Sequence, residues 1–228
     1  MTTTMHDRFV SPDSVTAHFV RRGRGAEFEM EAAWVASRLG GDCRRVLDVG
    51  CGNGALFESI GRQRVFGVDA NLDGLLACRQ GGSSRVVCAD GLALPFADGA
   101  FDAVVTQHVI EHIDDQAAAL REWRRVLSKR GRLLLLTPNA AFVDQSVFND
   151  PTHTRLLQPD ELAKIAERSG LRVVETATLG LPWFRQIGTK PGLWRARRFV
   201  IRQARGIARV PGLRWRGQTL CLVATRDA

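Results

Sequence analysis

A short aliphatic run followed at once by three closely spaced glycines constrains the fold more than any other feature of this sequence. The segment reads Val46-Leu-Asp-Val-Gly-Cys-Gly-Asn-Gly54, and a helical pattern begins near Ala55. Glycines at such a turn let the backbone bend sharply and approach a ligand closely. In doubly wound α/β sheets, ligands bind beside the carboxyl ends of the strands. The segment therefore predicts a ligand-binding α/β domain.

Short aliphatic runs alternate with helical patterns along the rest of the chain. This alternation is typical of a parallel sheet with helices on both faces. The run Leu133–Leu136 has no polar alternation, as expected for a strand buried on both faces. Strands are predicted at Val46–Val49, Val65–Asp69, Arg85–Ala89, Ala103–Gln107, Leu133–Thr137, Arg172–Thr178 and Thr219–Thr225, and helices at Ala26–Leu39, Ala55–Ile60, Asp73–Arg79, Ala117–Leu127 and Pro159–Ser169.

An aspartate lies in or directly after each of the first three predicted strands. Asp48 precedes the glycines, where a carboxylate suits an ammonium group and would repel a pyrophosphate. Asp69 ends the second strand and suits paired ribose hydroxyls, while Asp90 after the third could accept from an adenine amine. The glycine spacing is G-x-G-x-G, whereas nicotinamide-dinucleotide enzymes carry G-x-G-x-x-G. An amino acid, a ribose and an adenine are the parts of S-adenosylmethionine, whose sulfonium also favours an acidic crevice.

The motifs resemble those of the class I S-adenosylmethionine-dependent methyltransferases, in the type 11 group with ubiquinone- and menaquinone-biosynthesis-like enzymes. The resemblance rests on Leu47-Asp-Val-Gly-Cys-Gly-Asn-Gly, Gly67-Val-Asp-Ala-Asn, Ala89-Asp-Gly-Leu-Ala-Leu-Pro-Phe, Phe101-Asp-Ala-Val-Val-Thr-Gln-His-Val-Ile-Glu-His-Ile and Arg125-Val-Leu-Ser-Lys-Arg-Gly-Arg-Leu-Leu-Leu-Leu-Thr-Pro-Asn. Ser128-Lys-Arg-Gly departs from the Pro-Gly-Gly turn usual there, at a place remote from the chemistry.

The resemblance implies a Rossmann-like, seven-stranded and mostly parallel sheet in the order 3-2-1-4-5-7-6, with the last strand antiparallel. It places the glycines at the methionine part, Asp69 at the ribose, Asp90 at the adenine, and Gln107 and His108 near the reacting methyl. The expected cofactor contacts are Asp48, Gly50, Cys51, Gly52, Asn53, Gly54, Asp69, Ala70, Asn71, Asp90, Gly91, Leu92, Gln107 and His108.

Histidines supply the candidate catalytic bases, because the unperturbed pKa of imidazole lies near neutral pH. His108 follows the fourth predicted strand, and His153 lies in the segment Asn149–Arg155, whose equivalent in related enzymes helps to form the acceptor pocket. A packing role is an open alternative for both. His108 and His112 are four residues apart and could share a helical face, but the sequence places no third ligand, so no metal site is expected.

The composition is that of a globular chain, with 45% apolar and 25% charged residues. Five cysteines without C-x-x-C spacing argue against structural zinc and a disulfide framework and favour a reducing cytoplasm. We expect one domain over residues 1–228, comprising a helical cap (1–40), a core (41–180 and 217–228) and a basic amphipathic insertion (181–216). No apolar run is long enough for a signal peptide or a membrane span.

The net charge of +8 belongs to the end of the chain, because residues 176–228 hold eleven basic residues and one acidic residue. A helical pattern over Leu193–Val210 places most arginines opposite an aliphatic face. This segment could pack on the domain, lie on an anionic membrane surface, or grip phosphates of RNA or of a phosphorylated substrate. The prediction is a methyltransferase acting on a small-molecule or lipid-like acceptor, with RNA methylation as the alternative and nucleic-acid binding disfavoured.

Overall fold

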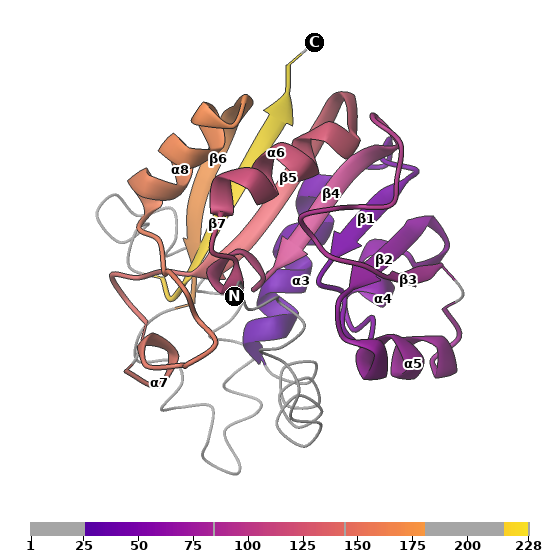
Figure 1. Cartoon of the computed structure of the whole chain (residues 1–228), viewed down its shortest axis with the longest axis horizontal. Coiled ribbons are helices and arrows are strands. Elements are labelled where there is room, and N and C mark those ends of the chain that lie inside the picture. The colour runs from indigo at the N-terminus through magenta and orange to yellow at the C-terminus, as the bar shows by residue number, and fades with distance from the viewer. Residues whose placement is uncertain (1–25, 84, 144, 181–216, 228) are drawn as a thin grey trace, which may run out of the picture.

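The computed structural model describes residues 26–83, 85–143, 145–180 and 217–227. A seven-stranded sheet in the order β3-β2-β1-β4-β5-β7-β6 forms its centre (Figure 1). The strands are β1 (Val46–Val49), β2 (Val65–Asp69), β3 (Val86–Cys88), β4 (Phe101–Gln107), β5 (Leu127–Pro138), β6 (Leu171–Leu179) and β7 (Thr219–Arg226). The helices are α3 (Ala26–Leu39), α4 (Phe57–Ile60), α5 (Leu72–Gln80), α6 (Gln116–Val126), α7 (Gln145–Phe148) and α8 (Pro159–Arg168), with 3₁₀ turns η1 (Arg62–Arg64) and η2 (Ile110–His112).

The strand directions confirm the predicted topology. β1 pairs in parallel with β2 and β4, and the parallel pairing continues outward to β3 on one side and to β5 on the other. β7 runs antiparallel to both of its neighbours, β5 and β6. As a result, the start of β7 lies at the same edge of the sheet as the carboxyl ends of the parallel strands.

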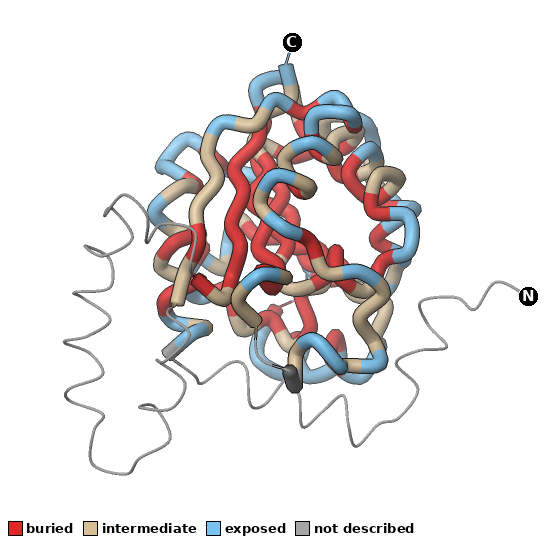
Figure 2. The backbone as a smooth tube through the Cα atoms, turned by 90° about the vertical axis from the view of Figure 1, so that its left-hand side faces the viewer, coloured by how far each residue is buried: buried red, intermediate tan, exposed pale blue. Residues whose placement is uncertain are grey.

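Helices cover both faces of the sheet. One apolar cluster packs α6 and α8 on one face through residues such as Trp123 and Leu162, and the other packs α3, α4 and α5 on the opposite face. The strands run as buried segments between these layers (Figure 2). Along β5, Leu133 and Leu135 join the first cluster while Leu134 and Leu136 join the second. This explains why the sequence there is aliphatic without polar alternation.

Several boundaries differ from the predictions. α4 begins at Phe57 rather than Ala55, because the loop after Gly50 uses the intervening residues and the Phe57 amide donates to the Gly54 carbonyl at 3.0 Å. β5 begins at Leu127 rather than Leu133, because Leu127 pairs with Phe101. The strand therefore includes the residues between the predicted end of the helix and the predicted start of the strand. The sequence predicts neither η2 nor α7, because their three and four residues are too few to show a clear periodicity.

The helix α3 packs on the face covered by α4 and α5, and its Glu31 reaches the carboxyl end of β4. The predicted basic insertion at 181–216 lies outside the described residues, as does most of the cap at 1–40, so the division into cap, core and insertion stays a prediction. Among the described helices, none combines the length and the apolar composition that crossing a membrane requires.

Candidate functional site

The glycine loop leaves β1 at the carboxyl edge of the sheet and is held by β2. The amides of Gly50 and Cys51 both donate to the carbonyl of Val68, at 2.7 and 3.0 Å. Gly50 has a φ of 76°, and a Cβ built on it would lie 2.2 Å from Cγ2 of Val109. Only glycine fits this position, because a side chain would be strained in the left-handed region and would also collide with the segment after β4.

Asp69 braces the glycine loop from the end of β2. Its Oδ2 accepts from the Gly52 amide at 2.7 Å, and its Oδ1 accepts from the Asn71 amide at 2.8 Å. Asn71 in turn caps α5 by accepting from the Gly74 amide at 2.8 Å. A Cβ on Gly74 would lie 3.2 Å from the backbone of Gly52, so the start of α5 packs directly on the loop. Each carboxylate oxygen retains a second lone pair that can accept from a ligand hydroxyl.

The two acids beneath the loop are costly to ionise. Asp48 is 2% exposed, and burial, followed by the charge of Asp69, raises the pKa of Asp48 well above its usual value. Burial also raises the pKa of Asp69, although the hydrogen bonds from Asn71 and Gly52 oppose that rise. The pKa of the Cys51 thiol is raised by burial and then by these two acids, which keeps it protonated. A cationic ligand would favour the ionised forms of Asp48 and Asp69, whereas a pyrophosphate would disfavour them further.

The third predicted acid lies in the loop after β3. Asp90 is exposed, and its Oδ1 accepts from the Leu92 amide at 2.8 Å, so one of its oxygens stabilises a turn. The Gly91 carbonyl accepts from Nε1 of Trp123 at 3.0 Å, which ties this turn to α6. Leu92 is 37% exposed. The adenine contact predicted for Asp90 would therefore use Oδ2 or the remaining lone pair of Oδ1.

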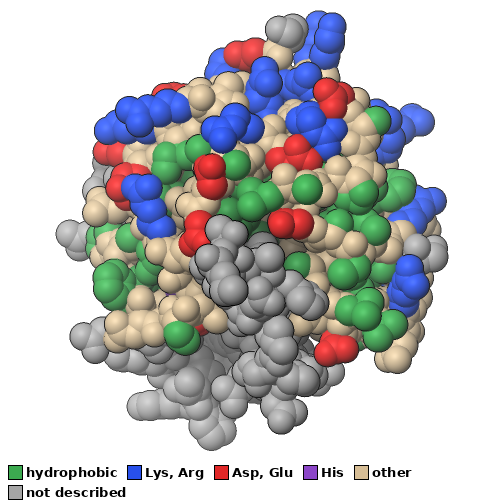
Figure 3. Space-filling model, in the orientation of Figure 1, with side chains coloured by type: hydrophobic (Ala, Val, Ile, Leu, Met, Phe, Trp, Pro, Cys, Tyr) green, Lys and Arg blue, Asp and Glu red, His purple; other side chains and the backbone are tan. Residues whose placement is uncertain are grey.

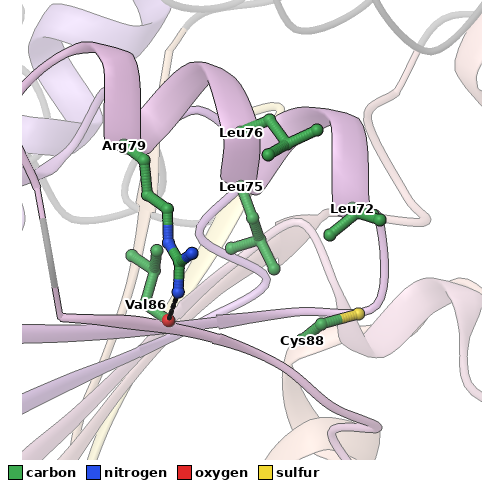
Figure 4. Close-up of a pocket in the computed structure, with 6 residues that line it drawn as sticks. All are labelled: Leu72, Leu75, Leu76, Arg79, Val86 and Cys88. Carbon is green, nitrogen blue, oxygen red and sulfur yellow. Dashed lines mark hydrogen bonds between the residues drawn. The ribbon is translucent and has the colours of Figure 1, made fainter.

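A small apolar pocket lies beside this region, between α5 and β3 (Figure 4). In the close-up, side chains of α5 point toward β3, and Nη2 of Arg79 donates to the Val86 carbonyl at 3.5 Å. Its lining consists of Leu72, Leu75, Leu76, Arg79, Val86 and Cys88. Leu72 follows Asn71 directly, so apolar side chains adjoin the place where the resemblance puts the adenosine.

Glu31 of α3 is a buried acid that no local sequence pattern predicted. It is 4% exposed and accepts from Gln107 Nε2 and from Thr219 Oγ1, the latter at 2.6 Å. Nε2 of His108 lies 3.1 and 3.2 Å from the two oxygens of Glu31. Burial alone would raise the pKa of Glu31, but the charge and hydrogen bond of His108 and the other two donors lower it below its usual value. α3 is thus joined to the ends of β4 and β7 by a buried carboxylate.

His108 adopts an unusual backbone conformation directly after β4. Its φ of 57° lies in the left-handed region, and Nδ1 lies 3.4 Å from Oε1 of Glu111. Glu111 is fully buried, and its Oε2 accepts from Oγ1 of Thr137 at 3.0 Å. The idea that His108 and His112 share a helical face was wrong, because only Ile110–His112 is helical, as a 3₁₀ turn, and His108 is not.

His112 instead meets His153, which comes from the loop after α7. The two ring centroids are 4.8 Å apart. Nδ1 of His112 lies 3.0 Å from the Thr152 carbonyl, and Nδ1 of His153 lies 2.7 Å from the Val147 carbonyl. Burial raises the pKa of the neighbouring Asp150, but hydrogen bonds from Thr152 and then the charges of both histidines bring it below its usual value.

The structure gathers the predicted cofactor residues at one edge of the sheet, in the loops and strand ends after β1, β2, β3 and β4. Asn53 stays within the glycine loop, where its Oδ1 accepts from the Ala55 amide at 3.2 Å, and the Ala70 carbonyl accepts from Cys88 Sγ at 3.6 Å. Cofactor contact by each of these residues stays a prediction. On the face seen in Figure 3, Lys and Arg side chains gather along the upper rim, where β7 ends and the parallel strands begin, away from this edge.

Known proteins match parts of this chain in sequence. A family model described as "Methyltransferase domain", of type 11, matches residues 47–135. A "Probable S-adenosylmethionine-dependent methyltransferase" of Mycobacterium tuberculosis is 37% identical over 155 residues, which cover 64% of this chain and 56% of that protein. A demethylmenaquinone methyltransferase of Roseiflexus castenholzii is 27% identical over 190 residues, covering 69% and 80%. The chain spans about half the length of the first curated relatives it matches.

Solved structures share the fold across more of the chain. A methyltransferase of Archaeoglobus fulgidus, named as dependent on S-adenosylmethionine, superposes with a TM-score of 0.63 at 24% identity, covering 92% of this chain and 99% of that one. This similarity establishes the fold alone. The family model and the sequence relatives show that residues 47–135 match a methyltransferase domain of type 11 and that the chain is similar to S-adenosylmethionine-dependent methyltransferases.

Proposed function

We propose that the chain is an enzyme that transfers the methyl group of S-adenosylmethionine to a small-molecule or lipid-like acceptor. The observation that carries this proposal is the pair of acids below the glycine loop, the buried Asp48 and the half-buried Asp69, whose pKa values are both raised. S-adenosylmethionine brings a sulfonium and an ammonium group, and positive charge beside these acids favours their ionised forms. A nicotinamide dinucleotide would instead bring a pyrophosphate to the same loop.

The residues present fit this cofactor. Asp69 would accept from the ribose hydroxyls with the lone pairs that Gly52 and Asn71 do not use, and Asp90 would accept from the adenine amine. Glycine at position 50 lets the loop turn directly against Val109 without a steric clash. When bound, S-adenosylmethionine supplies an already activated methyl group. The protein has to align the acceptor with it and exclude water.

A base is required only when the acceptor must lose a proton, and His108 and His153 are the candidates. Both nitrogens of His108 face carboxylates, Glu31 at 3.1 Å and Glu111 at 3.4 Å. This arrangement stabilises a protonated ring and favours a positioning role, in which His108 fixes α3 against the end of β4. As a base, His108 would have to release one of the two carboxylates before receiving a proton.

The acceptor class is supported by the relative named as a demethylmenaquinone methyltransferase, whose name indicates a quinone-type lipid acceptor. A lipid-like acceptor would also give a purpose to the arginine-rich segment 193–210, which we propose contacts an anionic membrane surface. The RNA-directed alternative gains no support from the relatives described above.

Calorimetry of the protein with S-adenosylmethionine and with NAD tests the cofactor. We expect binding of the first and none of the second, and the reverse result would overturn the proposal. Incubation with isotopically labelled S-adenosylmethionine and extracts of cell lipids and small molecules, followed by mass spectrometry, identifies the acceptor. A label found only in added RNA would replace the acceptor class with the alternative. Protein that does not associate with anionic vesicles at low salt would refute the membrane contact.

A further inference from the structure

We propose that Glu111, His112 and His153 form a binding site for a divalent first-row transition metal ion, with Zn²⁺ as the reference ligand. One ligand atom from each of the three side chains lies within 4.8 Å of the other two. Two imidazoles and one carboxylate suit Zn²⁺ and its first-row neighbours, whereas Mg²⁺ and Ca²⁺ prefer oxygen ligands. The proposal does not depend on methyl transfer.

The hydrogen bonds of the two histidines select the tautomer that a metal site requires. In each ring Nδ1 lies near a backbone carbonyl, that of Thr152 for His112 and that of Val147 for His153. A carbonyl can only accept, so Nδ1 carries the hydrogen, and in the neutral ring Nε2 carries the lone pair. Ligating histidines are held in this way, with the second ring nitrogen donating to a carbonyl or carboxylate.

The carboxylate is oriented in the same manner. Oε2 of Glu111 accepts from Oγ1 of Thr137 on β5 at 3.0 Å, and the Glu111 side chain is fully buried. The Glu111 carbonyl also accepts from the amide of Thr154 at 2.8 Å, which fixes the loop that carries His153 against η2. All three side chains are therefore supported by neighbouring polar groups from different elements, as metal ligands commonly are.

The spacing of the three ligand atoms is compatible with a cation. Ligand atoms around a tetrahedral ion with bonds of about 2.1 Å lie about 3.4 Å apart. The present limit of 4.8 Å requires the cluster to contract, and His153, which is only partly buried and lies on a loop, is the side chain that can move. The remaining coordination position would be filled by water or by an oxygen atom of a bound ligand.

In the sequence, His112 pairs by spacing with His108 and no third ligand is evident, so no metal site was expected. The third ligand lies 41 residues further on, at His153, and reaches His112 only because the loop after α7 folds back onto η2.

Calorimetric titration of chelator-treated protein with Zn²⁺ alone tests the site, in a Cys88→Ser background that removes the exposed thiol. We expect one Zn²⁺ per chain, and at least tenfold weaker binding in His153→Gln and in His112→Gln. Titration with Co²⁺ should produce visible absorption that both variants lose. Glu58→Gln, which changes an exposed glutamate paired with Arg62, is the matched control for Glu111→Gln and should keep full affinity.

Because Glu111 is buried, replacing it also endangers folding. The two histidine variants therefore carry the test, with circular dichroism as the check on folding. His6 and His18 lie outside the described residues, and the double variant His6→Gln/His18→Gln should bind Zn²⁺ as the unaltered chain does. Absence of Zn²⁺ binding, undiminished affinity in folded His153→Gln, or loss of binding in the His6/His18 variant would each overturn the proposal.

Discussion

Replacing Asp69 by alanine tests whether its carboxylate binds the cofactor or only stabilises the fold. In the structure this carboxylate accepts from the Gly52 and Asn71 amides, at 2.7 and 2.8 Å. Its proposed third role is to accept from the ribose of the cofactor. The substitution removes all three interactions, so both the stability of the protein and its affinity for S-adenosylmethionine should fall.

The two losses have different sizes. The Gly52 amide belongs to a buried residue, and leaving it without an acceptor should lower the free energy of unfolding by about 1–3 kcal/mol, while water can reach the half-buried Asn71. Hydrogen bonds to a charged group contribute about 1.5–3 kcal/mol, which corresponds to roughly 10- to 150-fold in the dissociation constant. We therefore expect Asp69→Ala to weaken S-adenosylmethionine binding by more than about tenfold.

The assay is calorimetric titration of S-adenosylmethionine at a temperature at which thermal melting shows the variant to be folded. Asp102→Ala is the matched control, because Oδ2 of Asp102 also accepts from two backbone amides, those of Arg44 and Arg45 at 3.0 and 2.9 Å. Asp102 lies at the start of β4, at the opposite edge of the sheet, so its loss should lower stability without changing affinity. If Asp69→Ala is folded and binds S-adenosylmethionine within twofold of the unaltered protein, the assigned role is wrong.

Three further changes test other parts of the structure. The raised pKa of Asp48 means that the folded protein holds a proton which the unfolded chain, with a pKa near 3.8, releases. Stability should therefore fall as pH rises from about 3.8 to the raised pKa of Asp48, and Asp48→Asn should abolish this component. Because S-adenosylmethionine favours the ionised forms of both acids, Asp48→Asn should also reduce the proton release on cofactor binding; calorimetry in buffers of different ionisation enthalpy measures the release, and an unchanged proton count would contradict the reasoning. Gly50→Ala places a Cβ 2.2 Å from Val109 Cγ2 at a φ of 76°, so we expect a fall of more than about 2 kcal/mol in the free energy of unfolding and weaker cofactor binding; urea denaturation and titration check both, and a neutral effect would mean that the loop can relax. Asp115→Ala removes the N-cap of α6 and should cost about 0.5–2 kcal/mol in denaturation experiments while leaving cofactor affinity unchanged; reduced affinity would show that α6 is coupled to the crevice.

Local sequence signals predicted most of the fold because the elements concerned are long enough to show a period. β2 and α3 match the predicted boundaries, and the core of β5 is visible as an unbroken aliphatic run. The resemblance supplied the strand order, which periodicity alone does not contain. The predicted start of α4 was wrong because the glycine loop includes residues before Phe57 whose composition also suits a helix.

The residues of the candidate site also fall into two groups, those with a local sequence signal and those without one. The sequence determined the glycine loop and the aspartates at the strand ends, because their backbone and charge requirements are met by residues that are neighbours along the chain. The tertiary structure alone decided that Glu31 meets His108, 77 residues away, and that Glu111 and His112 meet His153. A buried acid in a helix or a histidine in a loop has no local pattern that names its partner, since such pairings arise only when packed layers bring distant segments to one edge of the sheet.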